Sequence, residues 1–268
     1  MRIYDIFSKN NEYTKSMPRI STTIRSSIEE LDRAIFGFFP GTILILTSYD
    51  RMAKTSLTLD IVLDNAALYK TPTVVFSSVM TSDKMAKQLW LSLCPSEVIN
   101  KNTPLYLEEI GKLTISKLKE GIIKLKDASL IELVIIDSID YIYRSEKDEN
   151  NRFDKLYEFV HEMNLFAKEM EIAIMLTTSV LNEDIHPKEY ATIEPLAQFI
   201  VSLPSIELGE DKDKRRIIVS KNGDKKADLL VRFDRQRSTF RYMYPEWLEA
   251  KWKKLGRRLK RKRRVKHK

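Results

Sequence analysis

The sequence predicts an α/β protein whose core sheet is mainly parallel. Four short runs are almost continuously apolar, which suggests strands covered on both faces, as parallel strands are. These runs are residues 42–46, 73–76, 133–136 and 172–176. Between the third and the fourth run, Phe153, Leu156 and Val160 recur at helical spacing within residues 153–170. Strands that alternate with helices in this way indicate the α/β class.

The N-terminal part of the chain predicts an arm followed by a short helix. Residues 1–17 are polar and are expected to form an arm or linker. A helix is expected near Ser27, because Ser27 and Glu30 match the capping-box pattern. We expect one core domain over residues 18–245.

The C-terminal third predicts a β-rich edge. After residue 199 the apolar pattern shortens to runs at 199–203, 216–220 and 229–233. Residues 221–224, Lys-Asn-Gly-Asp, resemble a hairpin turn between the last two runs. These strands are expected to extend the parallel core with antiparallel pairs.

Composition limits the function classes. A chain of 268 residues with 43% hydrophobic content can bury a sizeable core. The single Cys94 excludes an internal disulfide and is typical of a reducing compartment. The three histidines are scattered, so no His/Cys metal cluster is expected, and no apolar run is long enough to span a membrane. We therefore expect a cytoplasmic protein that does not insert into a membrane.

Positive charge is concentrated in residues 246–268, called the basic tail below. Residues 251–268 carry 12 Lys or Arg and no acidic side chain, whereas the first 250 residues have a net charge of −4. Leu248, Trp252, Leu255 and Leu259 form one apolar stripe at helical spacing. Dense Lys and Arg neutralise nucleic-acid phosphates. The expected nucleic-acid contacts are Lys253, Lys254, Arg257, Arg258, Lys260, Arg261, Lys262, Arg263 and Arg264.

Three other interpretations of the basic tail remain open. It is also compatible with a solvated tail that aids solubility, with an acidic protein partner, and with an anionic membrane surface. We favour nucleic acid, single-stranded DNA in particular, over protein docking and membrane contact.

Residues 48–55 resemble a phosphate-binding loop without its glycines. The motif G-x-x-x-x-G-K-[ST] connects a strand to a helix, and here the segment joins the apolar run 43–47 to the helical pattern 57–68. Ser48 and Ala53 stand at the glycine positions, while Lys54 and Thr55 match the motif. A methyl group on Ala53 is expected where backbone and phosphate nearly touch. The alternative is an ordinary strand-turn-helix.

A carboxylate follows the third apolar run. Asp137 ends the sequence Val-Ile-Ile-Asp, and an aspartate at such a strand end can hold magnesium beside a phosphate loop. Thr55 and Asp137 are therefore the expected magnesium ligands, and Ser48, Ala53, Lys54, Thr55 and Asp137 form the expected nucleotide site. The alternative is a strand-terminal aspartate that starts a turn.

The order of these segments resembles the RecA-like motor domain of DnaB-type replicative hexameric helicases. The resemblance spans residues 18–244. It rests on residues 26–32, 37–45, 48–55, 74–80, 105–114, 134–137, 174–182 and 217–223. It implies a RecA-like P-loop fold, with ATP and magnesium as ligands and DNA as the partner. The chain resembles the motor without the N-terminal primase-interacting domain, so assembly into a hexameric motor is doubtful.

The departures from this family fall on its catalytic positions. The resemblance places Val79 where the family has a water-polarising glutamate, and Val180 where it has a glutamine. Val219 and Lys221 stand at the lysine and arginine of its inter-subunit finger. An arginine finger alone contributes roughly 10³–10⁵ in rate, so no catalytic residue is predicted. Asp140, Glu108 and Glu109 are the carboxylates that could replace the missing glutamate.

We therefore expect a catalytically degenerate DnaB-like protein, a pseudo-ATPase that binds ATP and magnesium weakly at most. It would act as a nucleic-acid-associated or replication-interacting factor, with a helicase or replication protein as a further partner and with oligomers as an option. One alternative is an active, divergent ATP-dependent DNA helicase. Another is an inhibitor or cap of a true hexameric helicase through the shared interface.

Overall fold

The computed structural model describes residues 24–35, 37–48, 50–92, 99–100, 102–110, 114–128, 130–140, 149–179, 193–204, 213–221, 224–234 and 239–242. The expected arm, the basic tail, Cys94, Val180 and turn residues 222–223 lie outside the described residues.

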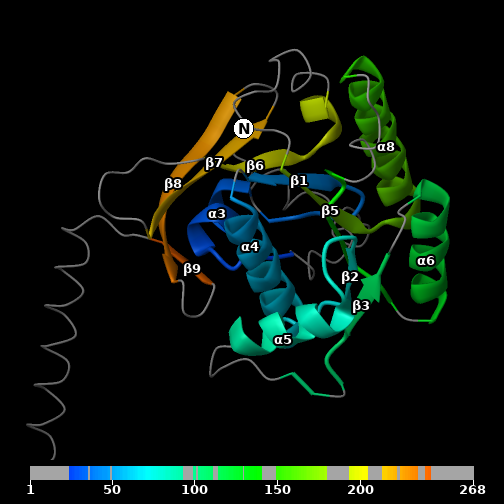
Figure 1. The fold of residues 1–268 in the computed structure, drawn as a ribbon, viewed down its shortest axis with the longest axis horizontal. Coiled ribbons are helices and arrows are strands. Elements are labelled where there is room, and N and C mark those ends of the chain that lie inside the picture. Colours follow the sequence, from blue (N-terminus) through cyan, green and yellow to red (C-terminus); the bar gives the residue numbers. More distant parts are fainter. Residues whose placement is uncertain are drawn as a thin grey trace, which may run out of the picture.

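The described strands form one nine-stranded sheet in the order β3-β2-β4-β5-β1-β6-β7-β8-β9 (Figure 1). Their bounds are β1 Ile43–Ser48, β2 Thr73–Ser77, β3 Leu105–Glu109, β4 Leu133–Asp137, β5 Ala173–Thr178, β6 Phe199–Leu203, β7 Lys214–Lys221, β8 Asp224–Asp234 and β9 Thr239–Tyr242.

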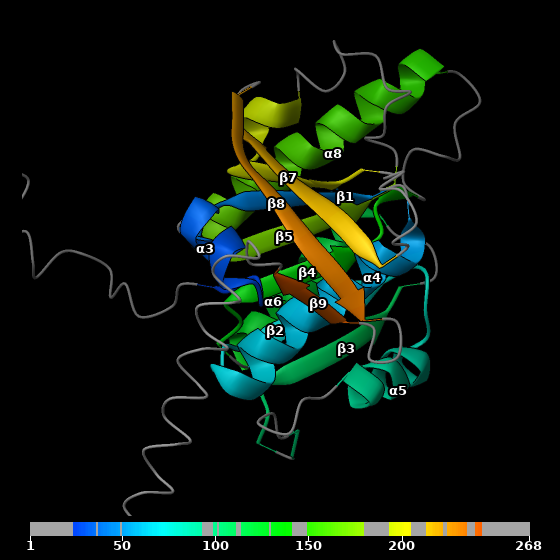
Figure 2. The same ribbon diagram turned by 90° about the vertical axis from the view of Figure 1, so that its left-hand side faces the viewer.

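The sheet is parallel from β3 to β6 and antiparallel from β6 to β9. β1 lies in the middle, with Leu46 beside Thr177 of β5 and Val201 of β6. The predicted fold class, a mainly parallel sheet with a β-rich C-terminal edge, is confirmed. Figure 2 shows β7 and β8 crossing in front of the parallel strands.

Helices cover both faces of the parallel part. Figure 1 shows α3, α4 and α5 on one side of the sheet and α6 and α8 on the other. Their bounds are α3 Glu29–Ile35, α4 Arg51–Leu63, α5 Ser82–Ser92, α6 Ile115–Ala128 and α8 Glu149–Met170. A π-helical turn, η1 Asp64–Leu68, continues α4, and a 3₁₀ turn, η2 Glu194–Leu196, precedes β6. No helix in this described part of the chain is long and apolar enough to cross a bilayer.

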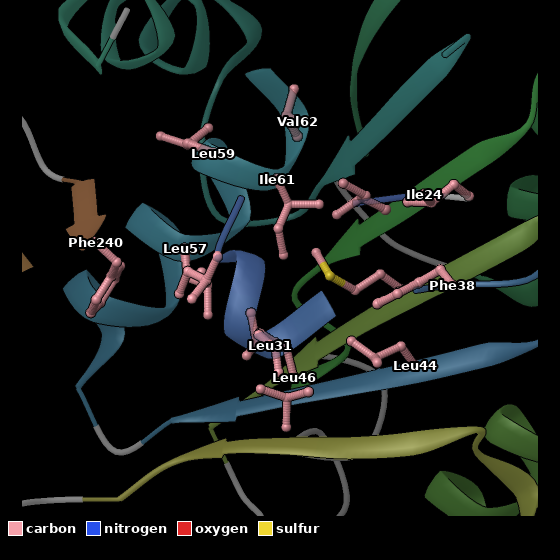
Figure 3. Close-up of a cluster of buried hydrophobic side chains, with 14 of the residues drawn as sticks. Ile24, Leu31, Phe38, Leu44, Leu46, Leu57, Leu59, Ile61, Val62 and Phe240 are labelled. Carbon is pink, nitrogen blue, oxygen red and sulfur yellow. The ribbon is translucent and has the colours of Figure 1, made fainter. Parts of the chain in front are cut away.

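Two hydrophobic layers hold the sheet between the helices. Alternate residues of β1 divide between them: Leu44 and Leu46 belong to the α4 layer, while Ile43 and Ile45 belong to the α8 layer. This follows from the two-residue period of a strand and explains why the central strands are apolar throughout. Figure 3 shows the α4 layer, where Leu57 and Phe240 extend it toward the C-terminal edge.

The helical pattern expected over residues 57–68 lies within α4 and η1, and α4 begins earlier, at Arg51, where Asp50 caps it. One local prediction needs correction. The capping box at Ser27 is wrong. Ser27 has a φ of 67°, and its hydroxyl has no hydrogen-bond partner among the described residues. Asp32 instead accepts a hydrogen bond from the backbone N–H of Ser26, 2.7 Å away, so the entry to α3 is held by a different pair.

Candidate nucleotide site

A small cavity of about 40 Å³ lies where the N-terminus of α4 meets the end of β4. Its lining residues are Arg51, Lys54, Thr55, Val79, Asp137, Ser138 and Asp140. The fold therefore brings Lys54 and Thr55 next to Asp137, although more than 80 residues separate them in the sequence. The carboxyl ends of parallel strands are the usual place for a ligand site in an α/β sheet.

Asp137 is the buried carboxylate of the cavity. It ends β4 with 3% of its surface exposed, and its Oδ1 accepts a hydrogen bond from the hydroxyl of Thr177 on β5, 2.6 Å away. Burial raises the pKa of Asp137, and the negative charge of Asp140 adds to this effect; the Thr177 hydroxyl and the Lys54 ammonium oppose it. The folded protein thus binds a proton on this carboxyl more readily than the unfolded chain does.

Lys54 is held by a carboxylate of its own chain. Its Nζ lies 3.8 Å from Oδ2 of Asp140, and both side chains are buried. The Thr178 hydroxyl and the Ser179 backbone N–H donate to Oδ1 of Asp140, over 2.7 and 2.9 Å. These bonds fix the carboxylate beside the lysine, so the ammonium faces a protein anion at the position expected for a phosphate.

The backbone donors of the loop are also engaged. Oδ1 of Asp50 accepts from the backbone N–H of Met52 at 2.9 Å and of Ala53 at 3.4 Å. The backbone N–H of Lys54 donates to the carbonyl of Asp50 over 3.0 Å, as the first regular bond of α4. The other carboxylate oxygen of Asp50 lies 3.7 Å from the Arg215 guanidinium on β7. Met52, Ala53 and Lys54 thus direct their N–H groups to Asp50.

The two residues at the glycine positions lie outside the cavity. Ala53 is fully buried and belongs to the α4 layer of the core, so its methyl group packs inward instead of toward a ligand. Ser48 is buried as well, and its hydroxyl donates to the carbonyl of Asp50 over 2.9 Å. The expected contact between the Ala53 methyl group and a phosphate stays a prediction.

The altered catalytic positions are placed as follows. Val79 lines the cavity and is half exposed. Lys221 donates to the carbonyl of Ala197 over 2.5 Å, and its burial lowers the pKa of the ammonium, against the effect of nearby Glu194. Val219 is fully buried in the core. Glu108 and Glu109 end β3 and do not line the cavity, whereas Asp140 does.

Sequence reasoning did not select Asp50 or Arg215. Asp50 carried a usable signal, because aspartate directly before a helix is a preferred N-cap residue. Arg215 carried none, since its position beside the loop follows only from the sheet order.

The cavity is narrow in this conformation, with a volume of about 40 Å³. The loop donors that would bind a phosphate are directed to Asp50. Thr55 and Asp137 both line the cavity, so the two expected magnesium ligands lie on its wall.

Comparisons with known proteins agree on the kind of domain. The family described as "DnaB-like helicase C terminal domain" matches residues 90–192. A replicative DNA helicase DnaB from Leifsonia xyli is 25% identical over 221 residues, covering 75% of this chain and 48% of that protein. A replicative DNA helicase DnaB from Geobacillus stearothermophilus is 20% identical and covers 63% of this chain and 41% of that protein. The chain thus spans about half the length of the curated relatives it matches, or less.

Solved structures support the same fold. A DnaB-like replicative helicase, described together with its interactions with primase, has a TM-score of 0.68 at 14% identity and covers 91% of this chain and 69% of that chain. A KaiC-like protein from Pyrococcus horikoshii has a TM-score of 0.65 at 19% identity and covers 84% of this chain. The family match over residues 90–192, the helicase relatives and the shared fold thus make this chain similar to the RecA-like C-terminal domain of DnaB-type helicases.

Proposed function

We propose that this DnaB-like domain acts as a nucleic-acid-associated replication factor that does not hydrolyse ATP efficiently. The observation that carries the proposal is the Lys54–Asp140 ion pair, which directs the ammonium expected to bind a phosphate to a protein carboxylate instead. Val79 supports it, since a valine on the cavity wall can neither accept a proton nor orient a water.

DNA is the proposed ligand class. Several relatives are replicative DNA helicases, and residues 251–268 of the basic tail supply 12 cationic side chains without an acidic one. Phosphate contacts of this kind give salt-sensitive binding with no sequence preference. ATP and magnesium are at most weak ligands in the proposal. A helicase or another replication protein is the proposed protein partner, in the cytoplasm.

The test is ATP turnover and DNA binding on the purified full chain. We expect no turnover above that of Lys54→Ala, with or without single-stranded DNA. We also expect DNA binding that weakens steeply with salt and is lost when residues 251–268 are deleted. Turnover that disappears in Lys54→Ala contradicts the proposal.

A charge-matched pair of variants separates tail-specific binding from net charge. In one variant the five residues 260–264 are changed to glutamine. In the other, five exposed lysines of the described body are changed to glutamine, namely Lys70, Lys84, Lys87, Lys117 and Lys124. Binding should fall only in the tail variant. An equal loss in both variants means that bulk charge alone attracts the DNA.

An active ATPase remains the second candidate, and one observation favours it. Asp140 lines the cavity and could serve as the missing water-activating carboxylate if it released Lys54. The turnover assay decides between the two, since Asp140→Asn would abolish hydrolysis only in an active enzyme.

A further inference from the structure

Asp50 has the surroundings of a bound phosphate. Backbone N–H groups at a helix N-terminus bind anions, because the N–H groups lack helical partners and the helix dipole is positive there. In this chain the N–H groups of Met52 and Ala53 donate to one oxygen of the Asp50 carboxylate. The anion at the start of α4 is therefore supplied by the chain itself.

A cation from a distant strand completes the contact. The Arg215 guanidinium on β7 lies 3.7 Å from the second oxygen of Asp50, with only 15% of its side chain exposed. Its guanidinium also lies over the Phe233 ring, 5.9 Å from the ring centre, so β7 and β8 hold it in place. An N-terminal helix cap of ordinary kind needs no such partner. N–H donors and an arginine together are the set that recognises a phosphate.

Lys54, which lines the cavity, shows the same substitution. Its ammonium is paired with Asp140 at 3.8 Å. Both groups that a phosphate loop would offer to a triphosphate, the backbone N–H groups and the lysine, thus contact carboxylates of the protein. Two independent carboxylates, Asp50 from the loop and Asp140 from the segment after β4, take these roles.

We infer that the Asp50 carboxylate is an internal substitute for a nucleotide phosphate, which keeps the predicted phosphate loop closed. A triphosphate competes with Asp50 for the same donors and is repelled by its charge. Removing that charge opens the loop to ATP. The inference rests on the proposed assignment of residues 48–55 as a phosphate loop, but it concerns binding and is separate from hydrolysis.

The experiment is calorimetric titration of the full chain with ATP and magnesium. Asp50→Ser keeps a side-chain oxygen that can cap α4, removes the charge and leaves more room. We expect affinity for ATP to rise by about tenfold or more, because like charges placed together are strongly unfavourable in a binding site. Adding Lys54→Ala to Asp50→Ser should remove the gain.

Two controls isolate the contact. Asp83→Ser removes an exposed aspartate from the first turn of α5, so it matches the change in charge and helix position. Arg216→Met removes the arginine next to Arg215, whose guanidinium pairs with Asp228 instead. Neither should change the affinity for ATP. If Asp50→Ser unfolds, Asp50→Asn serves in its place, since asparagine caps helices as well as aspartate does.

The outcomes separate this inference from the proposed function. A gain in ATP affinity specific to position 50 and dependent on Lys54 supports it. A folded variant without a gain overturns it, as does wild-type protein that binds ATP as tightly as the variant. In both of those cases absent turnover would leave the proposed lack of hydrolysis intact, whereas wild-type turnover that depends on Lys54 would defeat the proposed function itself.

Discussion

The two sides of the cavity are built on different principles. On the acidic side, Asp137 and Asp140 are buried and accept hydrogen bonds from hydroxyl groups on β5. On the loop side, α4 brings Lys54 and Thr55 to the cavity, while the Asp50 side chain before it is 40% exposed and caps the helix. The acidic side depends on contacts between distant strands, while the loop side combines a local helix cap with one ion pair to Arg215. One substitution can therefore change the loop conformation, whereas the acidic side is fixed by the sheet.

Strand register explains the rigidity of the acidic side. β4 and β5 are parallel, with Ile136 beside Leu176, so the next pair places Asp137 at Thr177. This pairing brings the Thr177 hydroxyl within hydrogen-bond distance of the Asp137 carboxylate without any adjustment of the loops. Single substitutions on the acidic side should consequently lower the stability of the protein strongly. Substitutions on the loop side should change the stability little but change the access of a ligand strongly.

The largest effect is expected for Lys54→Met. Removing the ammonium leaves Asp137 and Asp140 buried without this cation, and loss of one partner from a buried ion pair costs roughly 3–5 kcal/mol. We expect the free energy of unfolding to fall by about 3 kcal/mol at pH 7, measured by urea denaturation. Lys117→Met, at an exposed site on α6, is the control. A loss as small as that of the control would show that the acidic side does not depend on Lys54.

The pH dependence of stability sharpens this prediction. Burial raises the pKa of Asp137 above its ordinary value of 3.8. At pH values between 3.8 and this raised pKa, the folded state therefore binds a proton that the unfolded chain does not. Wild-type stability should then rise as the pH falls from the raised pKa toward 3.8. Asp137→Asn should lack this contribution, and the deficit of Lys54→Met should shrink over the same range. Urea denaturation at a series of pH values measures all three proteins, and parallel curves would contradict the expectation.

An intermediate effect is expected for Thr177→Val. This change leaves Asp137 without its 2.6 Å hydroxyl donor, and a hydrogen bond to a charged group contributes roughly 1.5–3 kcal/mol. We expect unfolding to become easier by about 2 kcal/mol. Thr47→Val on β1 is the matched control, because the buried Thr47 hydroxyl has no hydrogen-bond partner within the described residues. Thr47→Val should be neutral or stabilising, and equal losses in both variants would point to packing alone.

On the loop side, Asp50→Ala is expected to cost about 1 kcal/mol, the usual effect of deleting an N-cap. Asp50→Ser should recover most of that loss, since serine is also a good cap. Thermal unfolding of the two variants beside wild type measures the difference. If alanine and serine destabilise equally, the Arg215 ion pair would be the main contribution of Asp50.

The smallest effect is expected for Lys221→Met. Its ammonium is partly exposed and donates to a single carbonyl, that of Ala197. Loss of such a bond should change the free energy of unfolding by only about 0.5 kcal/mol. Chemical denaturation of this variant beside Lys54→Met compares the two lysines directly. A large loss for Lys221→Met would mean that strand β7 depends on this bond.

The sequence was sufficient to predict the fold and three residues that line the cavity, Lys54, Thr55 and Asp137. Continuous apolar runs identified the parallel strands, since both faces of each are buried. One of these strands, β4, places Asp137 at its carboxyl end, next to Lys54 and Thr55. The local pattern failed where two similar residues compete, as at the entry to α3, where Ser26 and not Ser27 makes the stabilising hydrogen bonds.

The remaining contacts depend on tertiary structure. The Lys54–Asp140 pair depends on the path of the chain after β4. The Arg215–Asp50 pair joins residues 165 positions apart, and only the sheet order β1-β6-β7 brings them together. A pattern of apolar residues does not encode such a pair, because both side chains are charged and neither lies in the core periodicity.

The central position of β1 also has a consequence for folding kinetics. β1 is the first of the described strands, yet its partners are β5 and β6, which follow about 130 and 155 residues later. Pairings between such distant segments raise the contact order and slow folding, because a long loop must close before the contact forms. During synthesis, both edges of β1 stay unpaired until β5 has emerged, and one edge stays open until residue 203 has emerged. Unpaired strand edges expose the chain to aggregation in this interval.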